Sequence, residues 1–199
     1  MVGQMGCVDD ECDRVLEVPD AHVEKLSAAR NGRVREQVAK SLALQGFPDV
    51  IEKLSRDRST RVKVAVAANI AIGVSPLVLD RLSVVRSRRI TEALASNPAI
   101  AGHANAIRSL AKSKNIWTRY NLAGNPALVT MPEAVDLLAN DSNLIVLIGL
   151  AQNSRIGEFV GVVEKLALVK DYYLLMFLEA NPSVGSESDW LFESRRNRE

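Results

Sequence analysis

Basic side chains recur at a constant interval in the first two thirds of this 199-residue chain. Three sets of positions, each stepping by 28 residues, are occupied largely by arginine or lysine. We call them the first basic column (Arg30, Arg58, Arg86, Lys114), the second basic column (Arg33, Arg61, Arg89, with Trp117 next in line) and the third basic column (Arg35, Lys63, Arg119). A row of cations neutralises a chain of phosphates, and an aromatic ring stacks a base or a sugar. The columns therefore predict a surface for nucleic acid or another polyanion.

The net charge of the whole chain hides this segregation. Residues 26–119 carry 17 basic and 6 acidic side chains, a net of +11, whereas residues 1–25 and 120–199 each carry a net of −5. The total is only +1, so the chain lacks the strongly basic character that is typical of nucleic-acid-binding domains. A second interpretation stays open: the cations pair with acidic side chains or backbone carbonyls as a ladder between repeats, and their long stems cover apolar surface.

The residues that must position these columns follow the same 28-residue period. Leucine starts each repeat, at Leu26, Leu54, Leu82, Leu110, Leu138 and Leu166. Serine or alanine comes next, a Ser, Asn or Asp follows five residues after the leucine, and an aliphatic residue follows after twelve. The fifteenth position, which we call the asparagine column, holds Asn69, Asn97, Asn125, Asn153 and Asn181, with Ser41 in the first repeat. A fixed period of this length predicts an array of repeats, each one supersecondary unit.

Each repeat is predicted to contain two α-helices of about nine to eleven residues, which we call helix A and helix B. Helix A begins at a proline after a turn residue, as at Pro76 and Pro132, because proline suits the first helical position. Helix B begins at the Ser, Asn or Asp position, whose side chain caps free backbone N–H groups. It ends at the asparagine column, where we expect a left-handed backbone conformation and often a following proline.

A single repeat cannot bury both faces of its helices, so the repeats are expected to stack. The predicted fold class is all-α: a right-handed α-solenoid (superhelix) of six 28-residue two-helix repeats with terminal caps. We expect an acidic lead-in over residues 1–18, one domain over 19–194 and a polar tail over 195–199. The apolar residues Trp190, Leu191 and Phe192 are expected in a terminal helix that closes the array.

Two runs carry a resemblance to a known repeat family. Residues 62–69 (VKVAVAAN) and 94–100 (LASNPAI) resemble the V-R-x-x-V-A-x-N-P signature of leucine-rich repeat variant proteins, which are relatives of HEAT repeats. The resemblance spans residues 26–193 and implies a repeat class, not a function. The 28-residue period is longer than that of the family, which favours a full second α-helix over a 3₁₀ turn. The family is also associated with a cysteine-ligated iron–sulfur segment, but this chain has only Cys7 and Cys12 and a cluster needs four ligands.

Helix B of the last two repeats is apolar all round. Residues 144–150 read LIVLIGL and residues 172–178 read YYLLMFL. Such helices must be covered. The residues expected at a protein interface are Ile145, Leu147, Ile148, Tyr172, Tyr173, Leu175 and Met176. A protein partner or a second copy of the chain is one predicted cover, and residues 190–192 of the chain itself are the other. Both runs are too short to cross a bilayer.

Little in the sequence points to catalysis. It contains no phosphate-binding loop, dinucleotide fingerprint or nucleophile elbow, and Cys7 and Cys12 are expected to be free thiols. We therefore expect a non-enzymatic cytoplasmic binding scaffold without cofactor, metal, membrane or small-molecule substrate. Its expected partner is a protein or a second copy, through the last two repeats. The alternative is DNA or RNA along the basic columns of repeats 1–4. A remote alternative is an enzyme like the HEAT-like DNA glycosylases, which requires a carboxylate facing Trp117.

Overall fold

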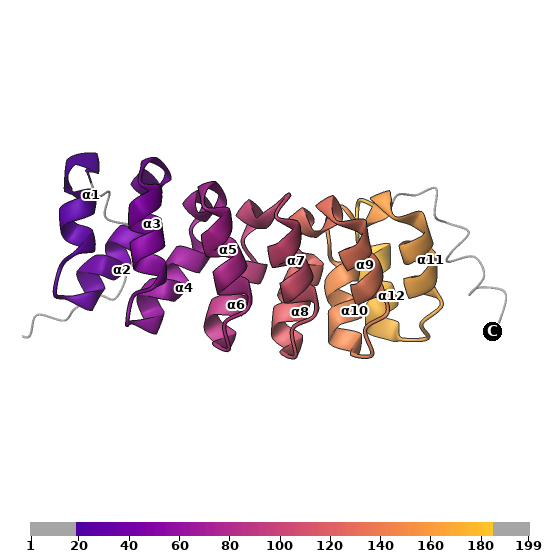
Figure 1. Ribbon diagram of the computed structural model, residues 1–199. Coiled ribbons are helices and arrows are strands. Elements are labelled where there is room, and N and C mark those ends of the chain that lie inside the picture. Colours follow the sequence, from indigo (N-terminus) through magenta and orange to yellow (C-terminus); the bar gives the residue numbers. More distant parts are fainter. Residues whose placement is uncertain (1–18, 185–199) are drawn as a thin grey trace, which may run out of the picture.

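The computed structural model describes residues 19–184, and its regular elements there are all helices (Figure 1). The A helices are α1 (Asp20–Ser27), α3 (Pro48–Ser55), α5 (Pro76–Ser83), α7 (Ala104–Ala111), α9 (Pro132–Ala139) and α11 (Val160–Ala167). The B helices are α2 (Gly32–Lys40), α4 (Thr60–Ala68), α6 (Arg88–Ala95), α8 (Ile116–Gly124), α10 (Leu144–Ala151) and α12 (Tyr172–Glu179). Successive A helices and successive B helices each begin 28 residues apart.

Short 3₁₀ helices follow the first five B helices. They are η2 (Leu42–Gly46), η3 (Ile70–Val74), η4 (Pro98–Ile100), η5 (Pro126–Thr130) and η6 (Ile156–Glu158). The sequence predicted a second α-helix in place of a 3₁₀ turn, whereas these repeats contain both. The α-helices are consequently eight or nine residues long, slightly shorter than predicted.

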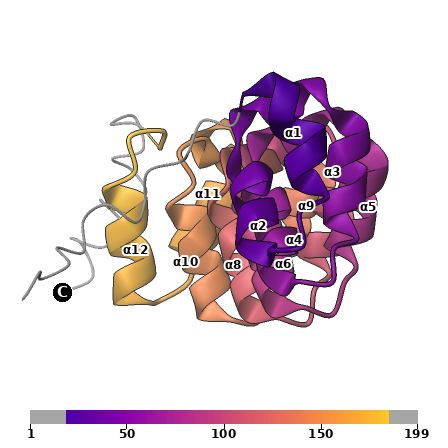
Figure 2. The same cartoon turned by 90° about the vertical axis from the view of Figure 1, so that its left-hand side faces the viewer.

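The helices lie in two layers. The A helices stand side by side along one layer and the B helices along the other, each contacting its predecessor and successor (Figures 1 and 2). The B helices pack more closely on one another than the A helices do.

A continuous apolar core runs between the layers. The repeat leucines from Leu54 to Leu166 are almost completely buried, and Leu26 at the end of the row packs partly against the same core. In α5 the buried residues are Val78, Leu79 and Leu82, as their helical spacing predicts. Equivalent leucines therefore occupy equivalent surroundings along the row.

Most of the predicted helix starts are confirmed. Proline occupies the first turn of α3, α5 and α9. The side chains of Asn31, Asn115, Asn143 and Asp171 accept backbone N–H groups at the starts of their B helices. Two predicted caps are wrong, because neither Ser59 nor Ser87 makes a side-chain cap hydrogen bond.

The prediction of a left-handed backbone at the asparagine column is also wrong. Asn69 has φ −79° and ψ 130°, and the other asparagines of the column described as caps have similar extended values. No non-glycine residue among those described has a positive φ. The extended backbone turns each asparagine side chain back toward the preceding repeat.

Each buried asparagine of the column joins its repeat to the one before. Asn125 donates from Nδ2 to the carbonyl oxygens of Ala95 at 2.8 Å and Asn97 at 3.0 Å, and its Oδ1 accepts the N–H of Ala127 at 2.9 Å. The same three bonds recur at Asn69, Asn97, Asn153 and Asn181.

Only an amide side chain supplies two donors and one acceptor in this arrangement. Ser41 has only to accept the N–H of Ala43, because no helix B precedes α2 in the described chain. The column thus has a structural role, and the position without a preceding helix B lacks the amide.

Some of the expectations drawn from the sequence concern residues that the structure does not describe. Those for the lead-in at 1–18, the tail at 195–199 and the terminal helix with Trp190, Leu191 and Phe192 lie outside the described residues. Within 19–184, no helix combines the length and apolar character that crossing a bilayer requires.

Candidate nucleic-acid interface

The first two basic columns lie at the starts of the B helices and are exposed. Arg30, Arg58, Arg86 and Lys114 directly precede helix B, while Arg33, Arg61 and Arg89 lie in its first turn. None of these seven side chains makes an ion pair within 4 Å among residues 19–184. Since each helix B contacts the next, the seven cations form two exposed rows, one across four repeats and one across three.

The third basic column is different, because its two arginines are used inside the chain. Arg35 binds Asp57 of the next repeat through Nε at 2.6 Å and Nη2 at 3.0 Å, and both side chains are only 9% exposed. Its Nη1 donates to the carbonyl of Ala29 at 2.7 Å. Oδ1 of Asp57, which accepts from Nη2 of Arg35, also accepts the N–H of Ser59 at 2.8 Å. This chain of bonds links the A–B loops of two successive repeats.

Arg119 repeats this arrangement three repeats later in the sequence, between the fourth and fifth repeats. It binds Asp141 through Nε at 2.5 Å and Nη2 at 3.2 Å and donates from Nη1 to the carbonyl of Ser113. Asp141 in turn accepts the N–H of Asn143. Arg35 and Arg119 are therefore not available to a ligand, and for these two residues the ladder between repeats is the interpretation that holds.

These pairs shift the pKa values of their carboxyl groups. The hydrogen bond from Arg35 holds the pKa of Asp57 below its usual value. Burial alone would raise the pKa of Asp141, but hydrogen bonds from Arg119 and from the Asn143 backbone outweigh it, and the pKa is lowered. Both aspartates are thus held as anions.

The sequence contains a signal for these pairs that the search for basic columns missed. The partner of Arg35 and Arg119 is the residue 22 positions later, three after the next repeat leucine. That position is aspartate where an arginine faces it, as at Asp57 and Asp141. It is Val85 after Lys63 and Val169 after Leu147. In the third basic column, a residue with aspartate 22 positions later, such as Arg35 or Arg119, is paired within the chain. Lys63, which has Val85 at that position, is not.

Lys63, the third member of this column, is half-buried and makes no ion pair among the described residues. It faces the position of Val85 rather than a carboxylate. Lys63 therefore remains with the first two basic columns as a candidate ligand-binding residue.

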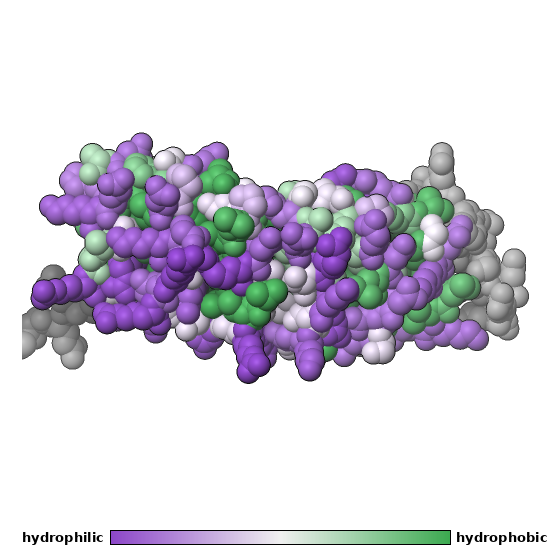
Figure 3. All heavy atoms as spheres, in the orientation of Figure 1, coloured by the Kyte–Doolittle hydropathy of each residue, from purple (hydrophilic) through white to green (hydrophobic). Residues whose placement is uncertain are grey.

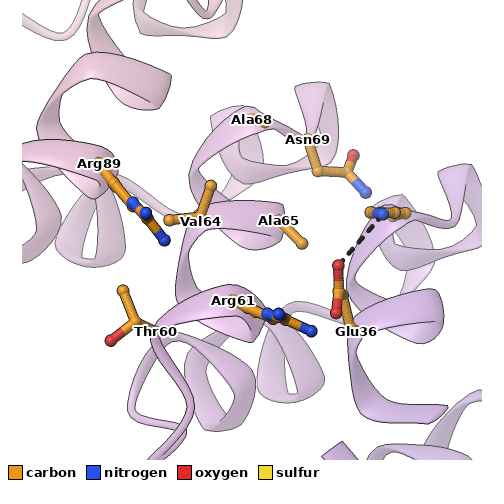
Figure 4. A pocket seen from close by; sticks show the side chains of 9 residues that line it. Glu36, Thr60, Arg61, Val64, Ala65, Ala68, Asn69 and Arg89 are labelled. Carbon is orange, nitrogen blue, oxygen red and sulfur yellow. Dashed lines mark ion pairs between the residues drawn. The ribbon is translucent and has the colours of Figure 1, made fainter. Parts of the chain in front are cut away.

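A hollow of about 520 Å³ lies on the B helices α2, α4 and α6 (Figure 4). Arg61 and Arg89 of the second basic column contribute to its rim, together with Thr60 and the ion pair between Lys40 and Glu36, whose N···O distance is 3.2 Å. Val64, Ala65 and Ala68 form an apolar floor. Figure 4 shows the Arg89 and Glu36 side chains on opposite sides of this floor. The hollow combines cations that suit phosphate with an apolar surface that suits a flat ring.

Trp117 continues the second basic column on α8 and is 39% exposed. The guanidinium of Arg88 lies 6.0 Å from the centre of its ring, and Tyr120 meets the ring edge-on with centroids 5.9 Å apart. Arg88 also binds Glu92 at 2.6 Å, and Glu92 accepts a hydrogen bond from Asn115 at 3.0 Å. The Glu92 carboxylate in this cluster is thus engaged by two partners, which disfavours its use as a catalytic base.

The predicted protein interface is partly inside the molecule. Leu147 and Leu175 are 8% and 3% exposed and belong to the core, while Ile145 and Ile148 are half-buried. Helix α10 packs against α8, α9, α11 and α12, so most of its apolar surface is covered by the described chain itself. The exposed residues are Tyr172, Tyr173 and Met176 on α12. The interface expected over two repeats is reduced to one helix.

Exposed apolar residues also occur outside α12. Figure 3 shows a face that is mostly hydrophilic, with separate apolar patches near α5 and near α11. On or next to these two helices in the sequence, the exposed apolar residues are Leu77, Val84, Val160 and Leu168. The patches on this face do not join into a continuous strip.

The described residues contain no group of three or more His, Cys, Asp and Glu side chains placed to hold a metal ion. Comparison with known proteins gives no further guide: no family model matches the chain, and no curated protein is significantly similar to it. The arguments about function therefore depend on the geometry of the site.

Proposed function

We propose that the chain is a right-handed α-solenoid of six 28-residue repeats, related to leucine-rich repeat variant and HEAT-like proteins, and that it works as a non-enzymatic scaffold. Its ligand is nucleic acid, bound along the first and second basic columns on the B-helix side of repeats 1–4. In this proposal the third column holds neighbouring repeats together through Arg35 and Arg119, while Lys63 adds to the bound surface.

One observation carries this proposal: seven exposed cations in two adjacent rows lack an ion-pair partner within residues 19–184. Other basic residues nearby do have partners, such as Arg56 and Arg81 with Glu52 and Lys40 with Glu36. Unpaired like charges held close together repel one another, and a linear polyanion relieves this repulsion. Two rows that cross three and four repeats suit an extended polyphosphate better than a compact anion.

The test is binding to labelled single- and double-stranded DNA and RNA at increasing salt. With about six phosphates neutralised, the logarithm of the association constant should fall against the logarithm of salt concentration with a slope near −5. Absence of binding to every one of these probes at about 50 mM salt, where counterion release favours binding most, would contradict the proposal.

Charge reversal tells where the ligand binds. Arg61→Glu together with Arg89→Glu should lower affinity at least tenfold and leave the helical circular dichroism spectrum unchanged, because both side chains are exposed and unpaired. The matched control is Lys165→Glu with Lys170→Glu, the same change of charge at α11 and just after it. An equal loss of affinity in both variants would indicate a response to net charge alone.

A second candidate function is protein binding or self-association at the last repeat. Tyr172 and Tyr173 are 72% and 60% exposed, and their rings pack edge to face 5.6 Å apart on α12. Exposed tyrosines beside a methionine are typical of the centre of a protein interface. Light scattering of the wild type and of Tyr172→Glu with Met176→Glu tests self-association. A mass of one chain at every concentration of wild type would exclude a second copy as the partner.

A further inference from the structure

The hollow on α2, α4 and α6 has features that the two rows of cations do not require. Phosphates need only the guanidinium groups of Arg61 and Arg89, yet between these groups lies the apolar floor of Val64, Ala65 and Ala68. We infer that the hollow receives a nucleobase, so that the B-helix surface prefers single-stranded nucleic acid over duplex. This inference rests on the proposed function and specifies the class of nucleic acid.

The size and shape of the site suit a base with its phosphates. A volume of about 520 Å³ lies within the range of cavities that bind small ligands. Arg61 and Arg89 occupy equivalent positions on successive B helices, so phosphates on either side of one base can each meet a guanidinium. The hydroxyl of Thr60 on the rim is a further hydrogen-bond donor or acceptor for the sugar or the base edge.

The apolar floor favours a single strand for a physical reason. In a duplex the faces of the bases are stacked on one another, and only phosphates, sugars and base edges reach a protein. In a single strand the apolar faces of the bases are exposed to water, and covering one of them is favourable. The carboxylate on the rim does not oppose binding strongly, because Glu36 is already paired with Lys40.

The local sequence distinguishes this hollow from the next pair of repeats. One repeat later, the position of Val64 is taken by Glu92, which is bound to Arg88, and the position of Ala68 is taken by Ser96. Trp117 and Tyr120 then supply an aromatic surface on α8. Surfaces that suit a base thus occur in the second and fourth repeats, and a more polar one lies between them.

The experiment compares three probes that carry the same backbone charge per nucleotide. They are an oligothymidine of about 20 nucleotides, an abasic oligomer of the same length and a duplex of the same length. Fluorescence anisotropy should show that the full chain binds oligothymidine about fivefold to tenfold more tightly than the abasic oligomer, the gain that one covered base provides. When affinities are compared per phosphate contacted, the affinity for the duplex should be no higher than that for the abasic oligomer.

A variant that fills the hollow makes the test local. Ala68→Gln places a polar, uncharged side chain over the floor at an exposed position at the end of α4, so the fold is not threatened. It should reduce the preference for oligothymidine over the abasic oligomer, with the remainder due to Trp117 and Tyr120, and leave binding of the abasic oligomer unchanged. The matched control is Ser96→Gln, the equivalent exposed position one repeat later and outside the hollow, which should keep the full preference.

The outcomes separate the inference from the function on which it rests. Equal binding of oligothymidine and abasic oligomer by the wild type, or the same effect of both glutamine variants, overturns the base site and leaves nucleic-acid binding in place. Tighter binding to polyglutamate than to oligothymidine overturns the inference in favour of an acidic protein ligand. Failure to bind any nucleic-acid probe at low salt removes the proposed function and the base site together.

Discussion

The first four repeats and the last two share one backbone arrangement but use it differently. In the first four, the exposed turns at the starts of the B helices carry arginine or lysine, and two buried arginine–aspartate pairs join the first repeat to the second and the fourth to the fifth. Between the fifth and sixth repeats the corresponding positions are Leu147 and Val169. Both regions keep the buried leucine and the asparagine with its three hydrogen bonds.

The difference shows which residues maintain the row and which are free to change. The hydrogen bonds of the asparagine column and the packing of the repeat leucines are the same wherever a preceding repeat exists. The positions of the buried arginine–aspartate pairs, in contrast, hold apolar residues between the fifth and sixth repeats. The junction between the regions is also the closest contact of the B layer, where α8 meets α10 at Gly149.

Breaking one arginine–aspartate pair should have the largest effect. Arg119→Leu leaves Asp141 8% exposed with no partner for its charge, and a change of this kind costs about 3–5 kcal/mol. Urea unfolding followed by circular dichroism measures the loss. The same change at the exposed Arg89 should cost less than about 0.5 kcal/mol.

Replacing the ion pair by the apolar residues found between the last two repeats tests the same comparison. The double variant Arg119→Leu with Asp141→Val copies Leu147 and Val169, and should recover stability to within about 1 kcal/mol of the wild type because no unpaired charge remains. If the double variant were as unstable as the single one, the equivalence of the two regions would be wrong.

Removing an asparagine bond should cost the same in both regions. Asn97→Ala and Asn153→Ala each leave one carbonyl oxygen, that of Ala67 or Ala123, and one N–H without the partner that the asparagine supplied, at a cost of about 2–4 kcal/mol. The second carbonyl, that of Asn69 or Asn125, still accepts the N–H of Ile72 or Leu128. The control is Ser41→Ala, which loses a single bond at the end of the row. A cost at Ser41 equal to that at Asn97 would contradict the role assigned to the contact between repeats.

The close approach of α8 and α10 depends on a missing side chain. A Cβ at position 149 would lie 2.8 Å from the carbonyl oxygen of Tyr120, so Gly149→Ala should destabilise the chain by about 1–3 kcal/mol. Gly161→Ala on α11 is the matched control, because a Cβ there meets nothing within 4 Å. It should be neutral or slightly stabilising, since alanine favours a helix over glycine. Thermal melts of both variants compare the two.

Acid should weaken the pairs of the first region. The pKa values of Asp57 and Asp141 are lowered in the folded chain, so their contribution to stability is fully present above the unfolded value of about 3.9 and is lost as the pH falls through the folded pKa. When melting is measured between pH 3 and pH 7, the melting temperature should decrease once the pH is lower than about 4. The fall should be smaller in a variant with both pairs replaced by leucine and valine, and an identical fall would exclude these carboxylates as its source.

Much of the fold could be predicted from the sequence, because helix boundaries depend on local chemistry. Proline at the start of helix A and a polar residue at the start of helix B act within one turn, and a 28-residue period then places every later helix. The role of the asparagine column could not be found in this way, since its partners are carbonyls 28 and 30 residues earlier. Within a single repeat, an asparagine followed by proline is equally consistent with a helix end and with a contact to the preceding repeat.

The candidate site was predictable only in part, for a related reason. The columns identified which cations lie in rows, but whether a cation is free depends on a residue in the next repeat. Arg35 and Arg33 are indistinguishable by type, and only Asp57 decides that the first is buried. The hollow could not be predicted either, because its floor depends on how closely α2, α4 and α6 pack.

The asparagine bonds reach back by one repeat and no further, so each unit recognises only its predecessor. Excising residues 98–125 would join Asn97 to Pro126 and present to Asn153 the same two carbonyls, at Ala95 and Asn97, that Asn125 uses. Duplicating that segment would restore the same contacts with one unit more. The segment also contains Arg119, so either change leaves a buried charge of the Arg119–Asp141 pair without its partner unless that pair is replaced by apolar residues, as at Leu147 and Val169. With that adjustment, the chain can lengthen or shorten by whole units, and the span of its charged surface changes with it.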